Sequence, residues 1–382
     1  MRTANPQQVA YRGWVMGVEA FRSRAGIVDR SARGTLQFTG EQARWFLGQL
    51  FTNDIEHLEE GRGMDTLLLT PNGRITHVVR VVAAGRALFM DTDPGTAEPL
   101  RVFLEGRVFA TRVEISDRSA DFAIVSVLGP AADDLVQETL AARWEGEEPG
   151  AQSLGADLPS DEELASTHFG SAALVRLRRP IWGVDLWIRR DQAAEVVRAL
   201  VEAGGATATT EEFAELCVIE GLPTFGVDFD SGFLPQEAAL ERAVHFNKGC
   251  YLGQEAVAMA QRGAVKRRLR HLLFEGEPAA GPLRIDGAQA GTVTSVAREG
   301  ERGFGIAVVR TSVPVGAEVE VETEGGRVVR AAVGELPGTP EGPALPSARA
   351  LRERIAGAAT PPRHRRADHP RVPSPPGIDS GR

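Results

Sequence analysis

The chain has few cysteines and no long apolar runs near its start. Only two of its 382 residues are cysteines, Cys217 and Cys250. Two thiols are too few for a disulfide framework or for a metal site made mainly of thiolates, so no metal site is predicted and a reducing compartment is expected. Because residues 1–26 contain no apolar stretch suited to a signal peptide or a membrane span, the sequence predicts a cytoplasmic protein without membrane contacts.

Lysine is as rare as cysteine, although charged residues in general are common. The formal net charge is −9, which argues against a dedicated nucleic-acid binder. Positive charge comes almost entirely from arginine, since the only lysines are Lys248 and Lys266. Coding bias is one explanation. The other is that an ammonium group is required at Lys248, where a guanidinium would not substitute for it.

The chain is too long for one ordinary hydrophobic core, and its pattern of apolar residues, glycine and proline changes along its length. We predict an α+β region over residues 1–264, a small antiparallel β-barrel over 265–336, and a disordered tail rich in proline and arginine over 337–382. The barrel is predicted from short strand-like runs separated by glycine and proline, at residues 272–274, 290–296, 303–309, 318–321 and 328–333.

Helices in the α+β region are marked by apolar spacing and by N-cap residues. Three of them are predicted over residues 43–50, 191–203 and 211–220. Thr39 and Gln42 form a capping-box pattern before the first. Asp191 and Thr210 are the predicted N-caps of the other two.

The segment around Cys250 carries the chemistry that the sequence suggests most strongly. Cys250 precedes a helix predicted to start near Gly253, and Lys248 lies two residues before it. A helix N-terminus and a nearby ammonium both favour a thiolate, which is the nucleophilic form of cysteine. A buried structural cysteine in a tight turn is the alternative. Cys217, inside an apolar helical run, is predicted to be a core residue.

Three sequence blocks resemble known families. The run Lys-Gly-Cys-Tyr-Leu-Gly-Gln-Glu at residues 248–255 resembles the signature of the YgfZ-type folate-binding proteins. Residues 37–54 and 218–228 resemble blocks of the glycine-cleavage T-protein (aminomethyltransferase-like) superfamily, and the resemblance extends over residues 25–335. It implies ferredoxin-like α+β modules and a terminal β-barrel around a folate cavity.

The resemblance also implies a set of ligand-binding residues. Glu220 matches the glutamate that binds the pterin ring, whose paired N–H donors suit a carboxylate. Asp91 matches a polar folate contact, and the aromatic rings of Phe225 and Tyr251 are candidates to flank the pterin. Without the resemblance, Glu220 would be interpreted as a surface residue at a helix end, and either aromatic residue could equally be a core residue.

The implied function is binding of tetrahydrofolate, with support for iron–sulfur cluster assembly or repair in client enzymes, including tRNA-modifying ones. In that interpretation Cys250 is the reactive thiol and Lys248 tunes it. One alternative is a folate-dependent aminomethyltransferase or demethylase, although residues 76–78 lack the catalytic aspartate of the T-protein. Another is a non-catalytic folate-binding regulator. Whether the chain is an enzyme is left open by the sequence.

Overall fold

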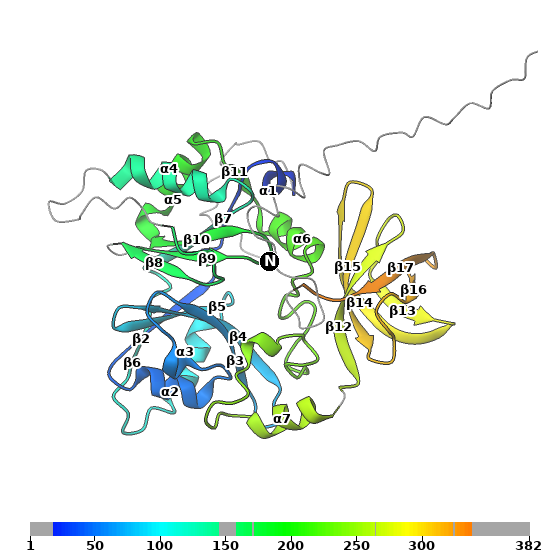
Figure 1. The fold of residues 1–382 in the computed structure, drawn as a ribbon, viewed down its shortest axis with the longest axis horizontal. Coiled ribbons are helices and arrows are strands. Elements are labelled where there is room, and N and C mark those ends of the chain that lie inside the picture. The colour runs from blue at the N-terminus through cyan, green and yellow to red at the C-terminus, as the bar shows by residue number, and fades with distance from the viewer. Residues whose placement is uncertain (1–17, 145–157, 170–171, 264, 324, 338–382) are drawn as a thin grey trace, which may run out of the picture.

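The structure is a computed structural model that describes residues 18–144, 158–169, 172–263, 265–323 and 325–337. The predicted tail lies outside these residues except for Pro337. Two α+β modules, each built on one sheet, lie one above the other, and a β-barrel lies beside both (Figure 1). This arrangement confirms the predicted α+β fold with ferredoxin-like sheets and a closed antiparallel barrel.

The five-stranded sheet is antiparallel throughout. Its strand order is β3 (Gly63–Leu69), β4 (Ile75–Ala84), β5 (Ala87–Thr92), β2 (Gly34–Thr39) and β6 (Glu114–Asp117). Helices α2 (Ala43–Leu50) and α3 (Ala97–Glu105) cover one face. Apolar residues of both helices, such as Leu47 and Leu100, are fully buried against Val79 and Val81 of β4. The alternation along β4 therefore leaves residues such as Arg80 for the opposite face.

The six-stranded sheet belongs to the second module. Its strand order is β11 (Ala206–Ala208), β1 (Gly26–Asp29), β7 (Phe122–Leu128), β10 (Gly183–Arg189), β9 (Ala172–Leu177) and β8 (Ser166–Phe169). Only β1 and β11 run parallel. Helices α4 (Ala132–Trp144) and α5 (Ala193–Glu202) cover one face, where Leu135 and Leu200 are buried.

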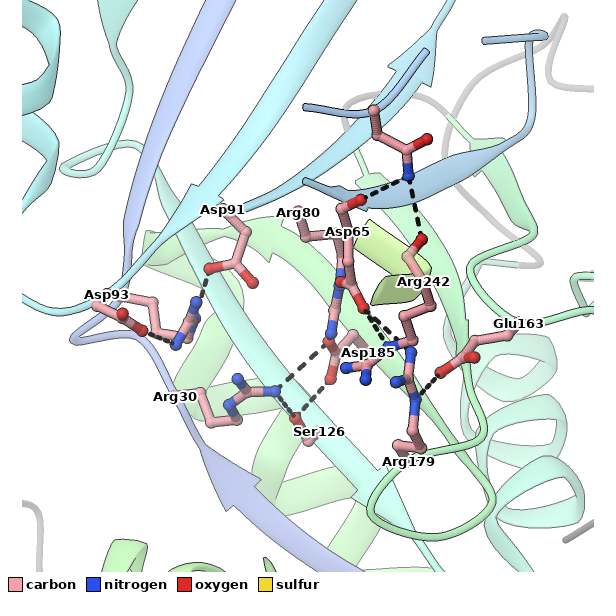
Figure 2. A network of polar contacts seen from close by, with 12 residues as sticks. Arg30, Asp65, Arg80, Asp91, Asp93, Ser126, Glu163, Arg179, Asp185 and Arg242 are labelled. Carbon is pink, nitrogen blue, oxygen red and sulfur yellow. Dashed lines mark hydrogen bonds and ion pairs between the residues drawn. The ribbon is translucent and has the colours of Figure 1, made fainter. Parts of the chain in front are cut away.

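The two uncovered sheet faces pack against each other. Val82 and Phe89 of the five-stranded sheet belong to one apolar cluster with Val175 and Trp187 of the six-stranded sheet. Charged residues also lie in this interface, because Arg80 on β4 donates to the buried Asp185 on β10 (Figure 2). The interface is therefore partly apolar and partly ionic.

The chain then passes through α6 (Thr210–Ile219) and α7 (Gln254–Arg262) to the barrel. The closed barrel has the order β12 (Arg267–Phe274), β15 (Arg302–Arg310), β14 (Ala288–Glu299), β13 (Gly281–Ile285), β16 (Glu318–Glu322) and β17 (Val328–Gly334). Shorter elements are α1 (Glu19–Ser23) and the 3-10 turns η1 (Ile55–His57), η2 (Arg190–Gln192) and η3 (Glu241–Ala243). No helix in the described part of the chain has the length and apolar character of a membrane span.

The predicted helices exist, but their predicted caps were wrong. Thr39 ends β2, and Gln42 accepts from the backbone of Arg112 instead of closing a capping box. Asp191 lies in a 3-10 turn and forms an ion pair with Arg189. A capping box does begin α6, but its cap is Thr209 rather than Thr210. In the first two cases the polar side chain finds another partner in place of the helix backbone: the backbone N–H of Arg112 for Gln42, and the side chain of Arg189 for Asp191.

Candidate functional site

Cys250 is exposed on the loop that leads into α7, whereas Cys217 is buried in α6. The helix begins at Gln254, after Gly253 in the left-handed conformation (φ 83°). Burial raises the pKa of the Cys217 thiol to about 12, so that thiol stays protonated and unreactive at neutral pH. The only cysteine with access to solvent is the one in the motif at residues 248–255.

Two glycines fix the start of α7 against the β3–β4 hairpin. A Cβ atom on Gly253 would lie 2.5 Å from the carbonyl oxygen of Thr70, and one on Gly73 would lie 2.8 Å from Cβ of Ala256. Both glycines have positive φ. The hairpin turn and the cysteine loop therefore meet backbone to backbone, and only glycine allows that approach.

Lys248 anchors the other end of the loop. Its Nζ donates to the carbonyl oxygens of Gly48 at 2.8 Å, Phe51 at 2.6 Å and Asn53 at 2.7 Å. These carbonyls lie at and just beyond the C-terminal end of α2, where unpaired acceptors and the negative end of the helix dipole favour a cation. Burial lowers the pKa of Lys248 to about 8. All three ammonium protons have acceptors in α2 and the segment after it.

The two predicted aromatic residues belong to one hydrophobic cluster. Tyr251 is buried there, and Lys248 Nζ lies 5.3 Å from its ring centre. Phe225 packs at the border of the same cluster and meets Phe229 edge to face, with ring centres 5.5 Å apart. The cluster also contains Leu269 of the first barrel strand. It therefore joins the cysteine loop, the segment after α6 and the barrel.

Glu220 closes the C-terminal end of α6. Its Oε1 accepts from Arg22 Nη2 at 2.6 Å, and its side chain is 8% exposed. Arg22 also donates to Glu299 on β14 at 2.7 Å. Burial lowers the pKa of Arg22, but the two carboxylates outweigh it and raise the pKa above its ordinary value. Glu220 is thus a largely buried acceptor where α1, α6 and the barrel meet.

Asp91 lies apart from the cysteine loop, in the ionic part of the interface between the sheets. Arg33 Nε donates to its Oδ1 at 2.5 Å, and Arg33 Nη1 donates to Asp93 at 2.9 Å (Figure 2). Asp91 is 1% exposed. Its carboxylate is already compensated by a guanidinium, and the structure does not bring it together with Cys250, Lys248 and Tyr251.

The sequence interpretation missed the centre of this interface. Arg80 Nη1 donates to Asp185 Oδ2 at 2.7 Å, and Ser126 donates to Asp185 Oδ1 at 2.5 Å. Arg30 lies 3.7 Å from the same carboxylate. The sequence did carry one indication of these pairs. Arg80 and Asp185 are each a single charged residue within an otherwise apolar strand pattern, and charged residues are rarely buried unless they are paired.

Residues 76–78, where the resemblance to the T-protein would place a catalytic aspartate and this chain has none, lie at the start of β4. Thr76 donates to the carbonyl of Leu68 at 2.9 Å, and His77 Nδ1 lies 3.2 Å from the Thr76 hydroxyl. Burial lowers the pKa of His77, so its imidazole is neutral at pH 7. Within the described residues, no group of three or more His, Cys, Asp or Glu side chains is placed to hold a metal ion.

Known proteins resemble the chain in sequence and in fold. The model of the GCVT N-terminal domain matches residues 5–149. An aminomethyltransferase from Rubrobacter xylanophilus is 28% identical over 85% of this chain and 86% of its own length. A chloroplastic putative transferase from Arabidopsis thaliana is 25% identical over 84% of this chain and 72% of its own length. The solved aminomethyltransferase T of the glycine cleavage system from Bartonella henselae has the same fold, with a TM-score of 0.73 at 19% identity, over 85% of this chain and 89% of that one.

The domain match and the relatives show sequence similarity to aminomethyltransferases, and the solved structure shows that the fold is shared. The relatives named above are an aminomethyltransferase and a putative transferase. The motif at residues 248–255 is the feature that suggests a YgfZ-type subfamily.

Proposed function

We propose that this chain is a YgfZ-type protein that binds tetrahydrofolate and uses the Cys250 thiol to support iron–sulfur clusters in client enzymes. The observation that carries the proposal is the exposed thiol on a loop fixed at both ends. Lys248 ties one end to α2, and Gly253 ties the other to the β3–β4 turn. A reactive group needs this combination of access and defined position.

The folate part of the proposal rests on the class and on Glu220. The T-protein family uses tetrahydrofolate, and Glu220 is a nearly buried carboxylate at the end of α6. A pterin ring offers two adjacent N–H donors to such a carboxylate. We infer that the pterin takes the place of the Arg22 guanidinium on Glu220, with Phe225 and Tyr251 near the ring. Asp91 is proposed to act on the folate only indirectly, through its ion pair with Arg33, because its own side chain is buried.

The cluster in this proposal belongs to the client enzyme. Two cysteines, one of them buried, do not provide the four thiolates that a stable cluster normally requires. Cys250 would act as a thiolate toward the client, and Lys248 would keep its loop in place and contribute positive charge. Folate would be a ligand of the same protein, bound by residues of α6 and the apolar cluster. The proposed setting is the cytoplasm.

Aminomethyl transfer is the second candidate function. It is favoured by the similarity to the Rubrobacter xylanophilus aminomethyltransferase, which extends over 86% of that protein. The residues at the site of the expected catalytic aspartate weigh against it, because they are Thr76, His77 and Val78. A neutral imidazole at His77 cannot replace the negative charge of a carboxylate beside a folate amine.

Titration with tetrahydrofolate by calorimetry tests the folate site. Replacing one charge-assisted bidentate pair costs about 1.5–3 kcal/mol, so E220Q should raise the Kd by about 10- to 100-fold. The matched control is E215Q, which changes an exposed glutamate of the same helix and should bind like the wild type. Equal affinity of E220Q and wild type, at unchanged melting temperature, would remove Glu220 from the site.

Complementation tests the thiol. A strain lacking the gene for this chain would express wild type, C250S or C217A, and the activity of an iron–sulfur tRNA-modifying enzyme would be measured. We expect C217A to restore the activity and C250S to fail at equal protein level. Restoration by C250S would contradict the role of the thiol. Formation of methylene-tetrahydrofolate from an aminomethyl donor by the purified protein would instead favour the second candidate function.

A further inference from the structure

A pocket of about 380 Å³ lies between the two sheets. This volume falls in the usual range for small-molecule sites. Its walls are mainly apolar and come from β4 and β5 on one side and from β7, β9 and β10 on the other. They are formed by Val82, Ala84, Phe89, Phe122, Ala173 and Trp187.

The pocket is separate from the residues of the proposed folate and thiol sites. Along β4, Val82 lines the pocket, Arg80 pairs with Asp185, and Ile75 lies in the cluster that contains Tyr251. At about 3.3 Å per strand residue, Val82 and Ile75 are about 23 Å apart. Along β4, the ion pair of Arg80 and Asp185 therefore lies between the pocket and the cluster that contains Tyr251.

The pocket is shaped for a flat aromatic body. Phe89 and Phe122 meet edge to face, with ring centres 5.9 Å apart and an interplanar angle of 77°. Trp187 is 4% exposed, so its indole is a fixed part of the wall. Ala173 pairs with Trp187 on the neighbouring strand, Ala84 lies on β4 of the other sheet, and both small side chains line the pocket. Aromatic ligands gain stacking or edge contacts in such a setting beyond the burial of their surface.

Two polar side chains of the lining, His168 and Glu60, can accept hydrogen bonds, and the buried Trp187 Nε1–H is a donor without a partner among the described residues. His168 Nε2 lies 3.3 Å from the carbonyl oxygen of Ala83 and 3.3 Å from the Ser166 hydroxyl. Burial lowers the pKa of His168, against smaller opposing effects of the Ala83 hydrogen bond and of Glu60, so the imidazole is neutral at pH 7 and one of its ring nitrogens is an acceptor. Glu60 accepts from the backbone of Gly85 at 3.0 Å and is the only formally charged residue of the lining.

From these features we propose a second small-molecule site that takes flat aromatic compounds with N–H donors and no negative charge. The apolar walls bind the ring, and the acceptors at His168 and Glu60 bind its donors. The carboxylate of Glu60 disfavours anions, which excludes the glutamate tail of a folate. The site does not depend on the proposed function, because none of its lining residues belongs to the folate or thiol sites.

A charge series on one ring system tests the site. Binding of tryptamine, indole and indole-3-acetate to the full chain would be measured by ligand-observed NMR and calorimetry. We expect tryptamine to bind more tightly than indole, and indole-3-acetate to bind least. A173L places a larger side chain in the pocket and should raise the Kd of tryptamine about tenfold or more.

Two further variants separate charge from shape. E60Q should reduce the preference for tryptamine over indole-3-acetate, whereas E59Q, which changes a neighbouring exposed carboxylate outside the lining, should leave that preference as in the wild type. A84L, on the opposite wall, replaces A173L if that variant does not fold. Failure of both indole and tryptamine to bind, or equal binding by the filled variants, would overturn the proposal.

Discussion

The ammonium of Lys248 lies 2.6 Å from the carbonyl oxygen of Phe51, a residue 197 positions earlier in the chain. This contact joins the loop of the exposed Cys250 thiol to the C-terminal end of α2. Lys248 therefore has a defined positioning role in addition to the proposed tuning of the thiol. The contact also gives a physical reason for a lysine in a chain that otherwise uses arginine, because a compact ammonium fits among three converging carbonyls.

Removal of this ammonium should destabilise the fold. K248M leaves the carbonyls of Gly48, Phe51 and Asn53 without their donor, and hydrogen bonds to a charged group contribute about 1.5–3 kcal/mol. We expect the free energy of unfolding, measured with urea, to fall by about 2–3 kcal/mol. K266M changes the only other lysine, which is exposed, and should stay within about 0.5 kcal/mol of wild type. Equal stability of the two variants would contradict the anchoring role.

The same lysine should make stability depend on pH in the alkaline range. Burial lowers its pKa in the folded chain to about 8, below the ordinary value of 10.5. Between these values the unfolded chain binds more protons at Lys248 than the folded chain, so stability from this residue rises with pH. The difference in unfolding free energy between wild type and K248M should therefore increase from pH 8 to pH 10.5. A difference that stays constant would argue against the lowered pKa.

The two glycines of the motif should differ sharply in their tolerance of a side chain. G253A places a Cβ 2.5 Å from the Thr70 carbonyl oxygen at φ 83°, which should lower stability by about 1–3 kcal/mol. Gly249 has no heavy atom within 4 Å of an added Cβ and does not have positive φ. G249A should consequently melt within a few degrees of wild type. Similar melting temperatures for both variants would show that the backbone contact at Gly253 does not constrain the loop.

The two cysteines should react at very different rates in the native protein. Cys250 is exposed, whereas burial raises the pKa of Cys217 to about 12. Iodoacetamide at pH 8 should modify Cys250 in the folded chain and modify both residues in urea, as measured by mass spectrometry of peptides. Modification of Cys217 at a comparable rate without denaturant would mean that α6 opens readily.

The ionic centre of the sheet interface should be sensitive to the loss of one charge. D185N leaves Arg80 without its buried counter-ion, and breaking a buried pair in this way costs about 3–5 kcal/mol. The surface pair of Asp191 and Arg189 is a suitable comparison, since D191N should cost no more than about 1 kcal/mol. Unfolding free energies that fall equally in both variants would contradict a buried, mutually dependent network.

Local sequence patterns were sufficient for element types and for the place of the exposed thiol. Apolar spacing gave α2, α5 and α6, and short runs between glycines gave most of the barrel strands. Helix caps were less predictable, because Gln42 and Asp191 find partners other than the helix backbone. The short strand β13 was not predicted, since Gly281 and Pro282 at its start are turn residues as often as strand residues.

The sequence by itself determined that Cys250 lies on a loop before a helix, because glycine positions and apolar periodicity act over a few residues. The tertiary structure decided which groups that loop and the folate candidates contact. Lys248 meets α2 across about 200 positions, Arg22 meets Glu220 across 198, and Arg80 meets Asp185 across 105. Partners so far apart are chosen by how the two sheets and the barrel pack, since a buried charge is stable only where packing supplies its counter-charge or its acceptors.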